Sequence, residues 1–318
     1  MYHDYDMQKI IDHIIDYTRN NKKKKLILDT DTYNEIDDQF AVTYAMVAED
    51  IDVIGMTAAP FTNERSTGPA DGMEKSYEEL LRVRNFVDPE NKMNIPCYRG
   101  STEYMKNIIT PVKSEAAENI VRLVHETDDI VYIAVIGCFT NVASALLLDP
   151  SIADKAVIIL LGSAKFECGT ANDFNLEQDR AAARVIFESG VPVIVIPAKG
   201  GCADTLMITN AEADFYLGQK SGEIGKFLCR NFFEDETAPF DENGNCCVRE
   251  RSIYDIATIA FLRNPYATGI RIITAHSVDD KGNWVKLNTD RKMIYINDLY
   301  RDHIMSEFFT AVRRANLK

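Results

Sequence analysis

The sequence predicts an α/β fold with an open, mostly parallel central sheet and helices on both faces, a Rossmann-like core. Short apolar runs that fit strands alternate along the chain with stretches of helical periodicity, which is typical of repeated β–α–β units. Several of these runs end in polar residues, as strands do at the ligand-binding edge of such sheets. At 318 residues, 46% apolar and 26% charged, the chain can bury a sizeable core.

The first predicted element is an amphipathic helix over about residues 5–20, with apolar side chains at helical spacing at Ile10, Ile11, Ile14, Ile15 and Tyr17. We expect residues 1–24 to form an N-terminal helical extension that lies on the body of the protein or on a partner. Residues 25–318 are expected to form a single domain, because no repeat or long linker divides them.

Five strand–helix pairs follow. The predicted strands are apolar runs near residues 26–29, 52–58, 130–136, 156–161 and 192–197. The predicted helices lie near residues 38–48, 70–86, 114–126, 141–148 and 178–188.

After residue 199 the pattern becomes more helical. We expect helices over 210–233 and 253–263, and then two short strands near 270–276 and 292–296. The acid-rich segment 234–245, which contains Pro and Gly, predicts a surface loop whose position between helices would suit a lid.

The charge and the apolar pattern exclude several classes of partner. A formal net charge of −14 would repel phosphate backbones, so nucleic acid is not expected as a partner. No apolar run approaches the roughly 18 residues of a membrane helix, and no signal-peptide pattern is present, so we expect a cytoplasmic protein that does not bind membranes. Seven cysteines without CxxC pairs indicate neither a disulfide framework nor a zinc knuckle.

The most informative segment is the one in which the first strand runs into four aspartates within ten residues, Asp29, Asp31, Asp37 and Asp38. Carboxylates crowded at a strand end repel one another unless a cation neutralises them, and Ca²⁺ or Mg²⁺ prefers such oxygen ligands. The pattern therefore favours a divalent metal site. The alternative is that Asp37 and Asp38 cap the next helix while Asp29 and Asp31 are solvated.

Three later segments repeat this design. The strand at 130–136 ends in Gly137-Cys138-Phe139-Thr140-Asn141, where glycine would let a backbone carbonyl approach a metal. The strand at 156–161 is followed by Asn172-Asp173-Phe174-Asn175, which offers both donors and acceptors to a polyol. Asp255 begins an apolar helix, either as one more metal ligand or as its N-cap.

These segments together resemble the inosine-uridine preferring nucleoside hydrolase family, from about residue 25 to the end of the chain. The family signature Asp-Thr-Asp-Pro-Gly-x-Asp-Asp-x-x-Ala corresponds to Asp29-Thr30-Asp31 and Ile36-Asp37-Asp38-Gln39-Phe40-Ala41, with a connection two residues longer. Residues 137–141 with Asp149-Pro150 resemble its Gly-x-Leu-Thr-Asn and Asp-Pro, and Asp173-Phe174-Asn175 resembles its Glu-Phe-Asn.

The resemblance implies Ca²⁺-dependent hydrolysis of the N-glycosidic bond of a ribonucleoside or related riboside to ribose and free base. It implies that Ca²⁺ is held by Asp31, Asp38, the carbonyl of Ile136 and Asp255, with Asp31 also acting as the base that deprotonates water. Asp37, Asp173 and Asn175 would bind the sugar. It further implies a homodimer or homotetramer.

Two positions depart from the family pattern. Tyr254 stands where many members have the histidine that protonates the leaving base; it is either the acid here or a buried aromatic residue. Asn63 would replace a ribose-binding asparagine if its loop folds back.

Two other functions fit parts of the sequence. Asp29 and Asp31 match the Asp-x-Asp start of haloacid-dehalogenase-like phosphatases, for which Lys199 is the best-placed lysine. A non-catalytic protein that binds Ca²⁺ and a riboside is compatible with Tyr254 and the altered asparagines.

Overall fold

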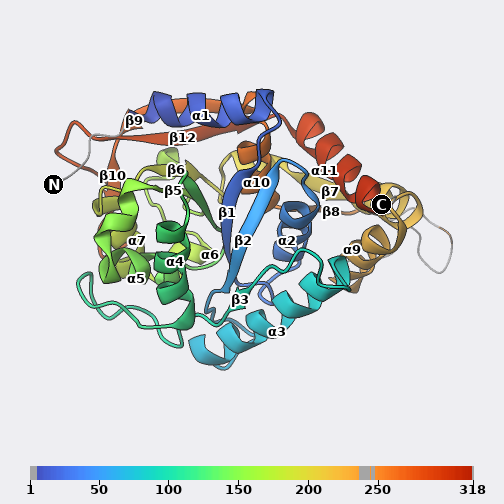
Figure 1. Ribbon diagram of the computed structural model, residues 1–318, viewed down its shortest axis with the longest axis horizontal. Coiled ribbons are helices and arrows are strands. Elements are labelled where there is room, and N and C mark those ends of the chain that lie inside the picture. The colour runs from blue at the N-terminus through green and yellow to red at the C-terminus, as the bar shows by residue number, and fades with distance from the viewer. Residues whose placement is uncertain (1–5, 236–243, 245–247, 317–318) are drawn as a thin grey trace.

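The computed structural model describes residues 6–235, 244 and 248–316. The main sheet consists of β1 (Lys24–Thr30), β2 (Ile51–Ala58), β3 (Cys97–Tyr98), β4 (Val131–Val135), β5 (Ala156–Leu161), β6 (Val193–Ile196), β9 (Thr268–Thr274) and β12 (Lys292–Leu299). Their order across the sheet is β3-β2-β1-β4-β5-β6-β12-β9, and each described pair of neighbours is parallel except β12 and β9 (Figure 1). The predicted mostly parallel α/β fold is confirmed.

Both faces of the sheet are covered by helices. Leu26 and Leu28 of β1 belong to one apolar core, which they share with α1 (Met7–Arg19), α2 (Asp37–Val47), α3 (Pro69–Val87), α9 (Gly222–Asp235), α10 (Ile256–Arg263) and α11 (Arg301–Ala315). Ile27, on the opposite face, belongs to the core formed with α4 (Glu115–Glu126), α5 (Thr140–Leu148) and α7 (Arg180–Glu188). A strand buried on both faces is apolar throughout, which explains the unbroken run that begins the first motif.

The smaller elements lie in the connections. They are α6 (Phe174–Gln178), α8 (Asn210–Glu212), the π-helix η4 (Ala213–Gln219), and the 3₁₀ turns η1 (Pro150–Asp154), η2 (Phe166–Cys168), η3 (Cys202–Thr205) and η5 (Pro265–Ala267). Two antiparallel pairs accompany them, β7 (Met207–Thr209) with β8 (Glu250–Ser252) and β10 (His276–Val278) with β11 (Trp284–Lys286).

The single helix predicted over 210–233 is divided in the structure. Gly222 has a φ of +61°, and a Cβ there would lie 2.8 Å from the side chain of Asn316, at the end of α11. Asn316 in turn accepts a hydrogen bond from the Ile224 backbone N–H at 3.2 Å. The break thus arises where α9 starts against α11, a helix that the sequence pattern did not predict. Most of the loop predicted over 234–245 lies outside the described residues: α9 includes Glu234 and Asp235, and of residues 236–247 only Gly244 is described.

The N-terminal helix α1 packs on the body of the same chain. Its Ile10 and Ile14 are buried, and Thr18 donates a hydrogen bond to the carbonyl of Arg263 at 3.0 Å. The ring of His13 lies 2.8 Å from the hydroxyl of Tyr132 in β4. The sequence left open whether this helix lies on the body of the protein or on a partner; in the structure its apolar face packs on the body.

The end of the sheet where β1 and β2 begin carries a buried charge network. Lys24 has a fully buried side chain whose Nζ lies 3.2 Å from Asp50 Oδ2, and Arg263 donates to Asp50 Oδ1 at 2.7 Å. Arg263 also donates to the hydroxyl of Tyr44 at 2.9 Å. Burial alone would raise the pKa of Asp50, but the charges of Arg263 and Lys24 outweigh it and lower that pKa.

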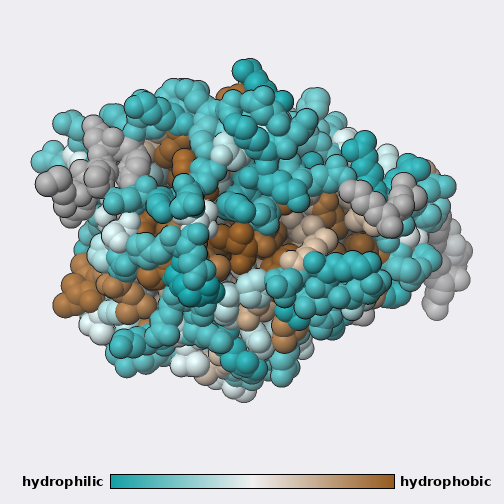
Figure 2. Space-filling view, viewed as in Figure 1, coloured by the Kyte–Doolittle hydropathy of each residue, from teal (hydrophilic) through white to brown (hydrophobic). Residues whose placement is uncertain are grey.

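A cavity of about 840 Å³ opens beside this network, between the end of α2, the start of β2 and α11. In the view of Figure 2, hydrophobic surface is visible in the hollowed middle of the molecule. None of the residues that line the cavity of about 840 Å³ belongs to the acidic motif. Among the described residues, no helix is both long enough and apolar enough to span a bilayer.

We expect Asp50→Asn to lower the free energy of unfolding by about 3 kcal/mol, because it leaves the buried Lys24 and the partly buried Arg263 without their counter-charge. Chemical denaturation measures this. The neighbouring pair Lys25–Asp52, with side chains 38% and 40% exposed, offers a matched control. Asp52→Asn should cost less than about 1 kcal/mol.

The pH dependence provides a further check on the same variant. Because folding lowers the pKa of Asp50, the unfolded chain binds its proton more tightly, and the stabilisation by Asp50 is present above the unfolded pKa of about 4 and lost as pH falls through the folded value. The difference between wild type and Asp50→Asn should therefore shrink in acid. Equal stability of the two proteins at pH 7 would contradict this role.

Candidate active site

The predicted site residues lie where the strands of the parallel sheet end. The chain leaves β1 after Thr30 and enters α2 at Asp37, and Ile136 directly follows β4. Asp255 directly precedes α10, which packs against α2. Parallel strands bring Asp31 and Ile136 to the same edge of the sheet. The packing of α10 on α2 brings Asp255 to this place from more than 200 positions along the chain.

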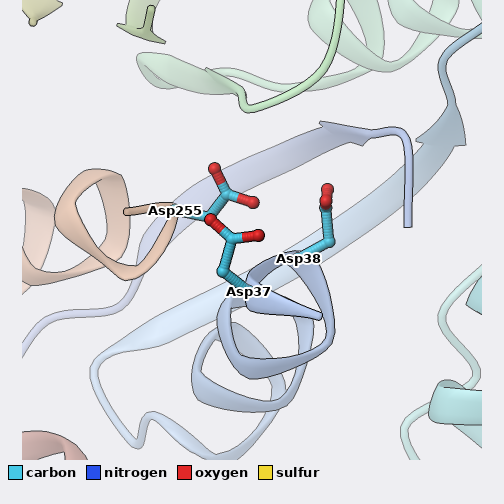
Figure 3. Close-up of side chains that lie close together, drawn as sticks. All are labelled: Asp37, Asp38 and Asp255. Carbon is cyan, nitrogen blue, oxygen red and sulfur yellow. The ribbon is translucent and has the colours of Figure 1, made fainter. Parts of the chain in front are cut away.

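Three carboxyl groups form a compact cluster at this edge. One oxygen from each of Asp37, Asp38 and Asp255 can be chosen so that all three lie within 4.8 Å of one another. Figure 3 shows Asp37 and Asp38 rising from the first turn of α2 and Asp255 reaching the same space from the start of α10. The positive ends of two helix dipoles therefore face the cluster and partly offset its charge.

None of the three side chains makes a capping hydrogen bond, although Asp255 occupies the N-cap position of α10. All three are buried, and neither α2 nor α10 has a side-chain hydrogen bond at its N-cap. Burial, together with the charge of Glu35, raises the pKa of Asp37 to about 7. Burial and the neighbouring carboxylates raise the pKa of Asp38 and of Asp255 well above the usual range. Each pKa shift reports a negative charge that this site disfavours in the absence of a cation.

Asp31 is the least satisfied residue of the site. Its side chain is 1% exposed, and neither carboxylate oxygen has a hydrogen-bond partner among the described residues. Burial raises its pKa well above the usual range, and the charges of Asp38 and Asp37 raise it further. A buried carboxylate without a partner is costly, and an oxygen-only set of ligands suits a hard divalent cation. The residues present therefore fit such an ion.

The carbonyl of Ile136, the predicted backbone ligand, accepts a hydrogen bond from Asn175 Nδ2 at 2.8 Å. A carbonyl oxygen has two lone pairs, so one stays available. The next residue, Gly137, packs against the loop after β1: a Cβ there would lie 2.9 Å from the Asp31 nitrogen and 2.8 Å from the Ala59 Cβ. Only glycine allows β4 to end this close to Asp31.

Asp29, the first aspartate of the motif, has a structural position. It is fully buried, and its Oδ1 accepts hydrogen bonds from Thr57 at 2.6 Å and from Asn141 at 2.8 Å. Burial raises its pKa to about 7 despite these bonds. Asn141 also donates to the carbonyl of Ala58 at 3.0 Å, so the pair ties together the ends of β1, β2 and α5.

A cavity of about 480 Å³ opens over the carboxyl cluster. Every residue predicted for catalysis, metal binding or substrate binding lines it except Asn63; the lining predicted residues are Asp31, Asp37, Asp38, Ile136, Asp173, Asn175, Tyr254 and Asp255. Asp173 caps α6 by accepting the Leu176 N–H at 3.0 Å, and burial raises its pKa to about 6.

Asn63 does not line the cavity, but it contacts a residue that does. Its Nδ2 donates to Asn34 Oδ1 at 2.6 Å, and Asn34 itself lines the cavity. Asn34 was not predicted. It belongs to the connection between Asp31 and Asp37, whose extra length relative to the family signature was the one signal that could have indicated it.

Tyr254 is half-buried and lines the cavity together with Asp204, which was not predicted. The hydroxyl of Tyr254 interacts with the side chains of Ser252 and Asp204. Burial is the main cause that raises the pKa of Tyr254. Lys199, considered above only for a phosphatase, also lines the cavity.

Comparisons with known proteins identify the family of this chain. The model of the family "Inosine-uridine preferring nucleoside hydrolase" matches residues 26–293. The chain is 29% identical over 249 residues to a probable uridine nucleosidase 1 of Oryza sativa subsp. japonica, covering 69% of this chain and 72% of that protein.

Two solved structures share the fold. One is the plant nucleoside hydrolase PpNRh1, with a TM-score of 0.72 and 20% identity over 91% of this chain and 99% of that one. The other is a purine-preferring ribonucleoside hydrolase from Gardnerella vaginalis, with a TM-score of 0.70 and 21% identity over 93% and 100% of the two chains. Because the family model spans most of the sequence and the acidic motif with it, the chain belongs to the inosine-uridine preferring nucleoside hydrolase family.

Proposed function

We propose that the protein hydrolyses the N-glycosidic bond of a ribonucleoside to ribose and free base, with Ca²⁺ as its metal. The observation that carries this proposal is the unpartnered, buried carboxylate of Asp31 beside the cluster of Asp37, Asp38 and Asp255. Family membership supports the reaction class and argues against the phosphatase alternative.

Asp31, Asp38, Asp255 and the carbonyl of Ile136 would hold the ion. When bound, the ion supplies positive charge that orients the ribose hydroxyls and makes the attacking water more acidic. Calcium suits the site because the donors are all oxygens from separate segments, and Ca²⁺ accepts irregular geometry more readily than Mg²⁺.

The protein side chains divide the remaining work. Asp31 accepts a proton from the attacking water, and Asp37, Asp173 and Asn175 hydrogen-bond the sugar. Asn63 is hydrogen-bonded to Asn34 and positions the side chain of Asn34 for contact with the sugar. As the bond to the base breaks, the ribose ring acquires positive charge, which the fixed carboxylates stabilise. Tyr254 donates a hydrogen bond to the departing base.

The test of this function is ribose release, measured by a reducing-sugar assay on purine, pyrimidine and nicotinamide ribosides and on p-nitrophenyl riboside, with and without EDTA. We expect at least one natural riboside to be cleaved, and EDTA to slow the reaction. Calcium binding without release from any riboside would instead support the non-catalytic riboside-binding protein.

We expect Asp38→Ala to abolish both Ca²⁺ binding and activity without unfolding the protein. Adding Ca²⁺ should raise the melting temperature of the wild type, since an ion that binds only the folded state stabilises it. It should not raise that of Asp38→Ala. In EDTA the variant should be at least as stable as the wild type, because one of four mutually repelling carboxyl groups has been removed.

The control for this experiment is Asp290→Ala, which removes an exposed carboxylate outside the cavity. It should keep the full response to Ca²⁺. Tight Ca²⁺ binding by Asp38→Ala, measured by titration calorimetry, would remove Asp38 from the ligand set.

We expect Tyr254→Phe to slow the cleavage of uridine and inosine by about 100-fold, and that of p-nitrophenyl riboside much less, since nitrophenolate is a stable anion that leaves without help from a hydrogen-bond donor. The quantity to measure is kcat/KM on each substrate. Tyr300→Phe, an exposed tyrosine outside the cavity, should change neither. Equal losses on both kinds of substrate would show that Tyr254 does not act on the leaving group.

A further inference from the structure

The cavity has one cationic side chain among its described lining residues, Lys199. The same lining carries the acidic side chains Asp31, Glu35, Asp37, Asp38, Asp173, Glu177, Asp204 and Asp255. The negative electrostatic potential of these side chains stabilises the sugar, which becomes positively charged in the transition state. It opposes the departure of the base, which leaves with the electron pair of the broken bond and becomes negative.

The described lining offers few groups that could offset this negative charge. It contains no histidine. Tyr254 carries a neutral hydroxyl, and the neighbouring carboxyl group of Asp204 interacts with it. A lysine ammonium group brings a full positive charge and three N–H donors. Lys199 is therefore the lining residue whose charge matches that of the leaving base.

The backbone of Lys199 is fixed while its side chain is free to reach. Its carbonyl accepts a hydrogen bond from the Lys165 N–H at 3.3 Å, and the residue forms a parallel bridge with Ala164. These contacts extend the pairing of β5 with β6 beyond the strand ends, at the edge of the sheet where the cavity opens. The side chain itself is exposed. A flexible four-carbon stem on an anchored backbone can follow a base as it moves away from the sugar.

We propose that Lys199 is a catalytic residue for the leaving group: its ammonium group donates a hydrogen bond to the departing base and stabilises the negative charge that develops there. The electron pair of the C1′–N bond passes to the base nitrogen, the water oxygen bonds to C1′, and a water proton passes to Asp31. The base then takes a proton from solvent, and Lys199 stays protonated throughout. This inference rests on the proposed nucleoside hydrolase function.

The test compares substrates that need leaving-group stabilisation with one that does not. In the holoenzyme with Ca²⁺, Lys199→Gln should lower kcat/KM for uridine and inosine by about 100-fold, the usual effect of removing one electrostatic donor. For p-nitrophenyl riboside, whose nitrophenolate is a stable anion, the loss should stay below about 3-fold. Lys199→Arg keeps the charge and the N–H donors and should recover most of the lost activity on nucleosides.

Lys165→Gln is the matched control, because it removes the same charge from the neighbouring strand end without belonging to the cavity lining. It should leave both rates unchanged. Equal losses on nucleosides and on p-nitrophenyl riboside, or no loss on either, would overturn the role of Lys199 while leaving the proposed function intact. A wild-type protein that cleaves no riboside would overturn both.

Discussion

The main physical constraint on this structure is that it holds four buried carboxyl groups together although they repel one another. Asp31, Asp37, Asp38 and Asp255 are all less than 6% exposed, and each pKa is raised by burial and by neighbouring acids. No apolar core requires this arrangement, and the folded chain keeps it only because the rest of the molecule holds it in place. The start of α2 and the start of α10 turn their positive dipole ends toward it, and the space above it is left open for a cation and a ligand.

The scaffold that tolerates this strain is stiff on both sides of the sheet. β1 is buried on both faces and pairs with β2 on one side and β4 on the other, so Asp31 follows a strand that is held from every side. Asp29 and Asn141 join three segments directly below the site, and the absence of a side chain on Gly137 lets β4 approach Asp31. Residues that touch no ligand therefore fix the geometry of those that would.

The two ends of the sheet treat charge in opposite ways. At the starting end, Lys24 and Arg263 neutralise Asp50, and the network is complete within the protein. At the other end Arg251 pairs with Glu35 at 3.2 Å, but Asp31 has no hydrogen-bond partner among the described residues. A charge network whose members are all paired stabilises the fold, whereas buried carboxylates without partners favour the binding of a metal ion. Above the proposed metal site, Lys199 is the described lining residue that opposes the acidic field, which is why the leaving base is its natural target.

The sequence by itself predicted the fold class and most of the candidate residues that the structure places around one cavity. Strand and helix periodicity is local, so β1, β2, β4, β5 and β6 and the longer helices between them could be predicted to within a few residues, whereas the short β3 and α6 were not predicted. Crowded aspartates after a strand indicate a metal without reference to any other segment. What depended on packing between distant segments could not be predicted. The division of the helix over 210–233 depends on Asn316, the path from Asn63 to the cavity depends on Asn34, and Asp204 and Lys199 matter because η3 and the end of β6 reach the same cavity as α10. Tertiary structure decided these points because each depends on side chains that are far apart in the chain, and the periodicity of the sequence does not specify which of them meet.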